Sequence, residues 1–129
     1  MKTLLISFEE MRDRTLKGED PFDLTIEKWM RIKRYVEEVT ELSDFQCLPH
    51  AASLVVPFCF RYQVLLCKGC PLFSLCGAGR GERFLRVIRL IHAYGIAGDM
   101  LPKEILLAEI DEIIFEIEAE KARHKGLYQ

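Results

Sequence analysis

The residues with the clearest capacity for chemistry are four cysteines, Cys59, Cys67, Cys70 and Cys76, which follow a C-x7-C-x2-C-x5-C pattern. The two residues between Cys67 and Cys70 make a tight local turn, which directs both thiolates toward one ion. Cys59 and Cys76 add two more sulfur donors from either side. Soft sulfur ligands select zinc or iron–sulfur clusters over hard cations. The spacing therefore predicts a metal centre held by these four cysteines.

Other interpretations of the cysteines stay open. Free thiols pack as small hydrophobes, which suits Cys59 on its apolar segment better than the three loop cysteines. Cys47, or His50 just after it, could replace Cys59 as fourth ligand if Cys59 faced the core. Zinc is the alternative metal, although zinc sites usually combine two short C-x2-C knuckles and this pattern has only one.

The cysteine loop resembles that of a known family. The segment Cys67-Lys-Gly-Cys70-Pro-Leu-Phe-Ser-Leu-Cys76, with Cys59 ahead of it, is similar to the cluster loop of the endonuclease III and adenine DNA glycosylase family. That family carries a four-iron cluster on C-x6-C-x2-C-x5-C, so the first gap is one residue longer here. The resemblance covers about 18 residues, from Cys59 to Cys76, and it implies a 4Fe-4S cluster on these ligands.

The resemblance does not extend to an activity. No helix-hairpin-helix with a Gly-x-Gly turn and a following aspartate is evident, so glycosylase activity is not carried over. The stretch from Asp20 to Trp29, combined with the Cys-x-x-Cys-Pro-Leu loop, also resembles small uncharacterised prokaryotic proteins. That second likeness implies nothing about a reaction.

A concentrated basic segment accompanies the cysteines. Residues 61–92 carry six basic side chains and one acidic one, whereas the whole chain has a formal net charge of −2. Arginine forms bidentate contacts with phosphates, so a basic patch beside a metal loop is typical of nucleic-acid binding. The alternative is a solvated helix face paired with glutamates of the C-terminal helix. The predicted docking residues are Arg80, Arg83, Arg86 and Arg89, and the candidate glutamates are Glu109, Glu112 and Glu116.

Composition limits the class of protein. A chain of 129 residues, half of them hydrophobic, fits one globular domain, and we expect residues 1–129 to form a single helical metal-binding domain. The first residues lack a signal-peptide pattern, and no apolar run reaches the roughly 20 residues of a membrane span. We therefore expect a cytoplasmic protein without membrane contact. In such a reducing compartment, clustered cysteines indicate metal or redox chemistry more often than disulfides.

Hydrophobic periodicity predicts the elements that must position these residues. Apolar residues recur at helical spacing in residues 3–17, 21–44, 81–94 and 101–125. Asp20 followed by Pro21 predicts the start of the second helix. The apolar stretch of residues 49–66 predicts a buried helix that is kinked or restarted at Pro57. Together these patterns predict an all-α fold, a compact bundle of four to five helices with a cysteine-rich loop from Cys67 to about Gly81.

The same periodicity predicts which residues fill the core. The second helix should bury Trp29 and its periodic neighbours, the last helix its isoleucine seam, and the helix between them a third apolar face. The predicted core residues are Leu24, Trp29, Ile32, Val36, Val39, Leu42, Phe84, Leu85, Ile88, Ile91, Leu106, Ile110, Ile113 and Ile117, with Leu107 and Ile114 widening the last seam.

These observations favour a non-enzymatic, or at most accessory, iron–sulfur protein whose cluster joins its helices. The arginine segment would dock nucleic acid or an acidic protein partner. A zinc-stapled interaction module and an electron-transfer or redox-sensing protein are the alternatives. The apolar neighbours of the cysteines favour a structural cluster over fast electron exchange. We also expect that the C-terminal helix could bury its seam against a second copy and so form a homodimer.

Overall fold

The computed structural model describes residues 4–39, 41–53, 56–62, 68–72 and 83–124. Helices are the only regular secondary structure in these ranges, which confirms the all-α prediction. There are more of them than the predicted four to five, because three short helices occupy the region between the long ones. The described elements are α1 (Phe8–Leu16), α2 (Pro21–Glu38), α3 (Leu42–Phe45), α4 (Leu48–Ser53), α5 (Pro57–Tyr62), α6 (Arg83–Ala97), the 3-10 helix η3 (Gly98–Met100) and α7 (Lys103–Arg123).

Side-chain caps fix the starts of the first two helices. Ser7 accepts a hydrogen bond from the Glu10 amide at 3.1 Å and so begins α1. Asp20 accepts from the amides of Phe22 and Asp23 at 2.9 and 3.1 Å, with Pro21 in the first helical position, as predicted. These carboxylate and hydroxyl oxygens satisfy amides that have no partner within the helix.

The second helix ends earlier than its periodicity predicts. It stops at Glu38, and Val39 turns into an extended conformation, so the expected continuation to residue 44 is wrong. Lys103 of α7 donates a hydrogen bond to the Val39 carbonyl, and Phe45 of the separate α3 packs its ring 5.8 Å from that of Tyr94. Tertiary contacts thus override the local pattern, and Leu42 is left 43 % exposed rather than buried.

The apolar stretch after α3 is divided as the prolines indicate. α4 ends at Ser53 and a new helix, α5, begins at Pro57, which has no amide to continue an earlier ladder. The side chain of Lys28, only 5 % exposed, donates from Nζ to the Ala52 carbonyl at 2.8 Å and so ties α2 to the end of α4.

The core face of α6 overlaps the predicted one, which included Ile91, but it is rotated away from Leu85. It buries Val87, Ile91 and Tyr94 completely, whereas Leu85 is 39 % exposed. Phe84 and Ile88 are only partly buried, at the edge of the core. The helix also continues to Ala97, beyond the predicted end at Tyr94. The turn lies instead in η3, where Gly98 adopts a left-handed backbone with φ of +60°.

α7 bears out its predicted seam. Leu106, Ile110, Ile113 and Ile117 are all 0 % exposed and belong to one hydrophobic core with Trp29, Ile32 and Val36 of α2. Among the described helices, the most extensive contact joins α2 and α7.

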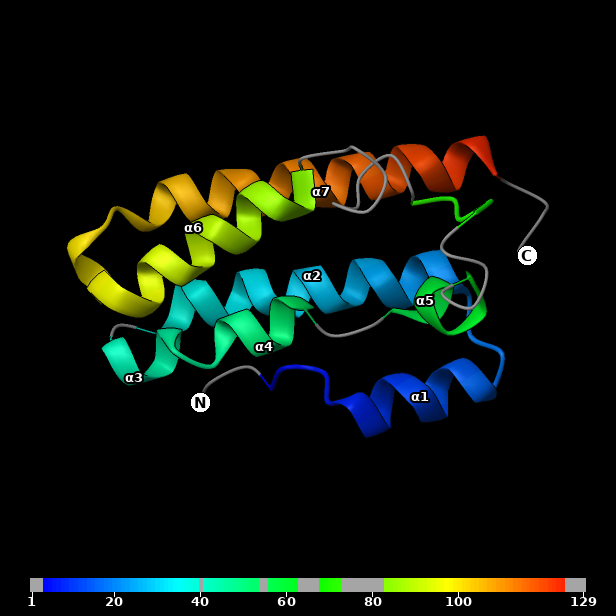
Figure 1. The fold of residues 1–129 in the computed structure, drawn as a ribbon, viewed down its shortest axis with the longest axis horizontal. Coiled ribbons are helices and arrows are strands. Elements are labelled where there is room, and N and C mark those ends of the chain that lie inside the picture. Colours follow the sequence, from blue (N-terminus) through cyan, green and yellow to red (C-terminus); the bar gives the residue numbers. More distant parts are fainter. Residues whose placement is uncertain (1–3, 40, 54–55, 63–67, 73–82, 125–129) are drawn as a thin grey trace.

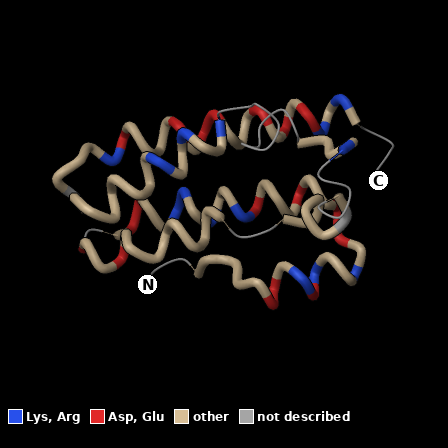
Figure 2. The backbone as a smooth tube through the Cα atoms, viewed as in Figure 1, with Lys and Arg blue, Asp and Glu red and all other residues tan. Residues whose placement is uncertain are grey.

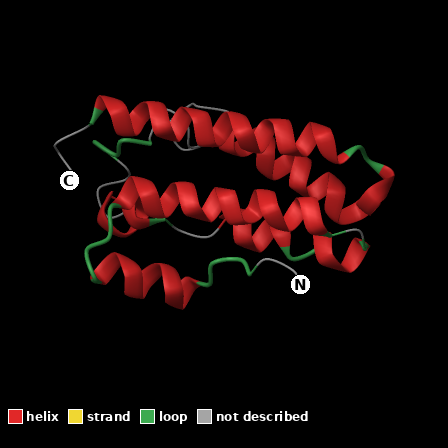
Figure 3. Ribbon diagram, turned by 180° about the vertical axis from the view of Figure 1, so that it is seen from behind, coloured by secondary structure: helices red, strands yellow, loops and turns green. Residues whose placement is uncertain are grey.

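The helices are arranged as an elongated bundle. α2 and α7 run antiparallel to each other, α6 lies beside α7, and α1 lies along the side of α2 away from α7 (Figure 1). The view from behind shows the same order (Figure 3). α3 lies at the opposite end of the bundle from α5 (Figure 1). None of the described helices combines the length and the apolar character needed to span a bilayer.

Candidate metal centre

Cys59 is held by the short helix α5. Its amide donates to the Val56 carbonyl at 2.8 Å, which forms the first turn of the helix. The residues on either side of Cys59 are anchored by aromatic contacts. The Phe58 ring packs edge-on against Phe22 of α2 at 4.8 Å, and the Phe60 ring lies 6.0 Å from Phe8 of α1. α5 is therefore fixed against both α1 and α2.

Cys70 lies in a tight turn that packs beside α5. The turn is made possible by Gly69, whose φ of +80° is in the left-handed region that favours glycine. A Cβ at this position would lie 3.7 Å from Tyr62 Cε1, so the turn approaches the face of α5 that carries Cys59 three residues earlier. Leu72, 2 % exposed, anchors the other side of the turn in the core.

Two of the four predicted ligands therefore come from neighbouring elements at one end of the bundle. Cys59 and Cys70 are both half-buried and both pack against the hydrophobic core. Cys67 and Cys76 lie outside the described residues, as does most of the predicted loop. Within the described ranges, no three metal-ligating side chains form a group.

Cys47 and His50, the alternative ligands, lie elsewhere. Both belong to the α3–α4 region, and α3 is at the far end of the bundle from α5 (Figure 1). The exposed Cys47 thiol donates to the Asp44 carbonyl at 3.2 Å and lies 3.2 Å from the Tyr35 hydroxyl. Burial, together with the Cys47 contact, raises the pKa of Tyr35. This position argues against Cys47 as the partner of Cys70.

Two of the four predicted docking arginines are paired with glutamates of α7. Arg83 contacts Glu109 at 3.3 Å and Glu116 at 3.2 Å, and Arg86 contacts Glu109 at 3.0 Å. The hydrogen bond to Glu116 raises the pKa of Arg83. Blue positions on α6 accordingly lie next to red positions on α7 (Figure 2). The alternative interpretation of this segment, pairing with α7, is therefore realised at Arg83 and Arg86.

Arg89 differs from these two. It is exposed, and it makes no ion pair with any residue in the described ranges. Arg80 lies outside those ranges. A groove of about 400 Å³ opens between α6 and α7, with Arg89 on its rim. Its lining residues are Arg86, Arg89, Leu90, Ala93, Ile105 and Glu109.

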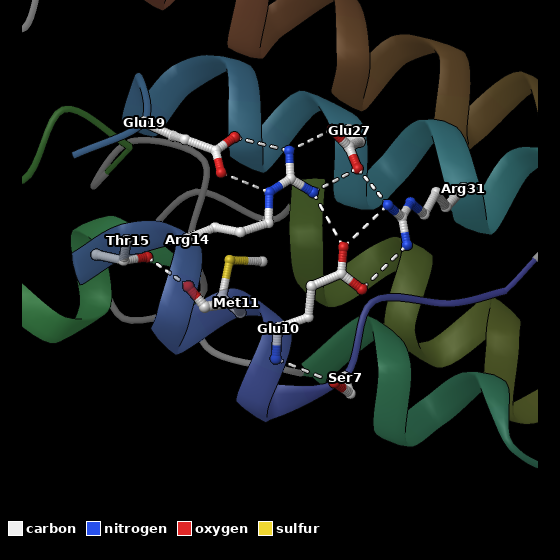
Figure 4. Close-up of polar contacts among 8 residues, drawn as sticks. All are labelled: Ser7, Glu10, Met11, Arg14, Thr15, Glu19, Glu27 and Arg31. Atoms are coloured by element: carbon white, nitrogen blue, oxygen red, sulfur yellow. Dashed lines mark hydrogen bonds and ion pairs between the residues drawn. The ribbon is translucent and has the colours of Figure 1, made fainter. Parts of the chain in front are cut away.

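A second charged cluster, not predicted from the sequence, joins α1 to α2. Arg14 contacts Glu10, Glu19 and Glu27 at 3.1, 2.8 and 2.7 Å, and Arg31 bridges Glu10 and Glu27 at 3.0 and 2.6 Å (Figure 4). Glu10–Arg14 and Glu27–Arg31 are both i,i+4 pairs, a signal that the sequence offers. Every charged group here has a partner inside the cluster, so its role is to hold α1 against α2.

This cluster makes stability depend on pH through Glu27. Hydrogen bonds from Arg14 lower the pKa of Glu27 from 4.5 to about 2. The ionised Glu27 carboxylate therefore stabilises the fold fully above about pH 4.5, and this stabilisation is lost as the pH falls toward about 2. We expect Glu27→Gln to remove this dependence. The difference in unfolding free energy between wild type and variant should shrink by about 1 kcal/mol from about pH 6 to about pH 3, because water screens a partly exposed pair.

Urea unfolding at the two pH values measures this difference. Glu9→Gln, at an exposed position of the same helix pair with no ion pair among the described residues, is the matched control. A Glu27→Gln variant whose pH profile matches wild type would contradict the role assigned to the cluster.

Comparison with known protein families, curated proteins and solved structures finds no match to this chain.

Proposed function

We propose that this protein binds a four-iron iron–sulfur cluster through Cys59, Cys67, Cys70 and Cys76 and that the cluster is mainly structural. The observation that carries the proposal is the cysteine spacing, C-x7-C-x2-C-x5-C, within 18 residues. The packing of the Cys70 turn against α5, through Gly69 and Tyr62, supports it because both cysteines then lie at the same end of the bundle.

The surroundings of the two described cysteines suit a soft, thiolate-bound group. Both thiols are half-buried at the edge of an apolar core, next to the buried residues Phe58 and Leu72. An iron–sulfur cluster or zinc prefers sulfur ligands, and hard cations prefer oxygen. When bound, the cluster would supply four metal–thiolate bonds that tie α5 to the turn of Cys70.

A structural role for the cluster follows from the apolar surroundings of Cys59 and Cys70. Apolar surroundings exclude water and slow electron exchange with a partner, so they favour a cluster that stabilises the fold over an electron carrier. Zinc bound by the same four thiolates would also hold α5 to the turn, and the protein would then be a zinc-stapled interaction module. No catalytic residue is part of the proposal, which describes a non-enzymatic protein.

Removing the metal tests whether the thiolates stabilise the fold. Because the unfolded chain has no preformed site, metal-binding free energy appears as folding free energy. We expect a strong chelator under anaerobic, reducing conditions to lower the thermal midpoint, measured by circular dichroism, by about 10 °C or more. The Cys70→Ser variant serves as the control and should not respond to the chelator. A wild-type midpoint unchanged by chelator would contradict a structural metal.

As the docking half of the proposed function, we propose that the basic segment of α6 binds an acidic protein partner rather than nucleic acid. Nucleic-acid binding draws its affinity from many unpaired cations, and Arg83 and Arg86 are paired with glutamates of α7. Arg89, beside the apolar groove, suits an acidic helix that also carries apolar side chains.

A further inference from the structure

The outer side of α7 carries a second apolar stripe. Ile105 and Phe115 are 53 % and 68 % exposed, although α7 is otherwise a core helix. Alanines continue the line at three- and four-residue steps, which places all these positions on one side of the helix. We call this set the outer stripe of α7: Ile105, Ala108, Phe115, Ala119 and Ala122.

The outer stripe is separate from the seam that the sequence suggested for dimerisation. Leu106, Ile110, Ile113 and Ile117 are fully buried within the chain, so they have no surface left for a second copy. A dimer formed by α7 must therefore use the outer stripe. Exposed apolar patches of this kind mark interaction surfaces.

The groove between α6 and α7 borders the outer stripe on the same face. Ile105 belongs to both, and Leu90 and Ala93, both half-buried, supply further apolar lining. Arg89 gives the groove an unpaired positive charge among the described residues, whereas the stripe is interrupted by the exposed Glu112. One face thus carries an acidic, apolar helix and a basic, apolar groove.

Because the outer stripe and the groove are complementary in charge and both apolar, this face fits the same face of a second copy. In a two-fold interface each surface meets the same surface on the partner, so every contact occurs twice. We propose that the protein forms a homodimer in which the outer stripe of α7 of each copy lies in the α6–α7 groove of the other. This proposal deepens the docking half of the proposed function and does not depend on the cluster.

The register follows from the antiparallel arrangement that a two-fold axis across α7 requires. With the axis at Ile110, Phe115 of one copy lies level with Ile105 of the other, at the floor of the groove. Glu112 of one copy then lies level with Ala108 of the other. Ala108 lies within reach of Arg89 of its own copy, because α6 runs antiparallel to α7 (Figure 1) and the Arg86–Glu109 contact sets which residues of the two helices lie side by side. The dimer would therefore hold two Phe115 anchors and two Arg89–Glu112 ion pairs.

Sedimentation velocity over a range of concentrations tests the dimer. We expect wild type to be dimeric, and Phe115→Glu to raise the dissociation constant about 30-fold or more, as loss of an interface anchor does. Circular dichroism should show unchanged helix content, since Phe115 is exposed. Leu16→Glu, at an 80 % exposed position of α1, is the matched control and should leave the dimer intact.

A charge exchange tests the register. Arg89→Glu should weaken the dimer about tenfold, and the double variant Arg89→Glu with Glu112→Arg should restore it. A monomeric wild type, or a Phe115→Glu variant that remains dimeric, would overturn the proposal. So would a monomer that binds an oligonucleotide at low salt and loses this binding in Arg89→Glu, which would assign the surface to nucleic acid. Iron, zinc and sulfide measured on the same samples show separately whether the cluster proposal holds.

Discussion

Replacing Cys70 by serine is expected to remove the proposed metal centre. We expect it to lower the free energy of unfolding more than any other single change at a residue that is not fully buried. The turn that carries Cys70 is held by Gly69 against Tyr62 and by Leu72 in the core, so the serine variant keeps the local fold but lacks one thiolate. Loss of a ligand from a four-thiolate site releases the metal. The folding free energy that the metal supplies, about 3 kcal/mol or more, is then lost.

The measurement is the iron content together with thermal unfolding under anaerobic conditions. Cys59→Ser should behave as Cys70→Ser does, because the proposed ligand set includes both thiolates and the Cys70 turn approaches Tyr62 of α5. Cys47→Ser is the matched control, since Cys47 is exposed in the α3–α4 region and should leave iron content and thermal midpoint unchanged. A Cys47→Ser variant that loses iron while Cys59→Ser retains it would replace Cys59 by Cys47 in the ligand set.

Replacing Trp29 by alanine is expected to cost about 3–5 kcal/mol of unfolding free energy. Trp29 is 2 % exposed at the centre of α2, and its ring stacks on Phe84 of α6 with centroids 5.8 Å apart and an interplanar angle of 16°. Its removal leaves a cavity between α2 and α6 that the rigid bundle cannot fill by a small shift.

Urea unfolding followed by circular dichroism measures this loss without relying on the tryptophan signal. Met30→Ala is the control, because Met30 is the next residue of α2 and is 42 % exposed. We expect it to cost less than about 1 kcal/mol. Similar losses for the two variants would mean that Trp29 does not occupy the core position described above.

The elements that the sequence predicts best are those in which local pattern and tertiary burial agree. The α7 seam has four apolar residues at helical spacing, and all four are fully buried. Asp20 and Pro21 start α2 because capping depends only on adjacent residues. Pro57 restarts a helix for the same local reason.

The predictions that fail are those decided by distant residues. α2 stops at Glu38 because the Val39 carbonyl accepts from Lys103 of α7, sixty-four positions away, and because Phe45 packs on Tyr94. α6 turns Val87 and Tyr94 inward and Leu85 outward, since the helix must fill the space left by its neighbours. Periodicity alone allows several overlapping apolar faces on such a helix.

The candidate site is predictable in its residue types and less so in its contacts. The spacing of Cys59 and Cys70 is evident in the sequence, whereas the approach of Gly69 to Tyr62 of α5 depends on the fold. The cluster of arginines is also evident in the sequence. Whether these arginines stay free for a partner or form ion pairs with glutamates of α7 depends on how α6 and α7 align. Arg83 and Arg86 form ion pairs with Glu109 of α7, whereas Arg89 forms none among the described residues.

The visible absorption spectrum of anaerobically purified protein, with iron and acid-labile sulfide determined on the same sample, tests the central claim most directly. We expect a brown protein with about four iron and four sulfide per chain. A colourless protein with one zinc per chain would shift the assignment to a zinc-stapled module, and a colourless protein without metal would contradict the metal centre itself.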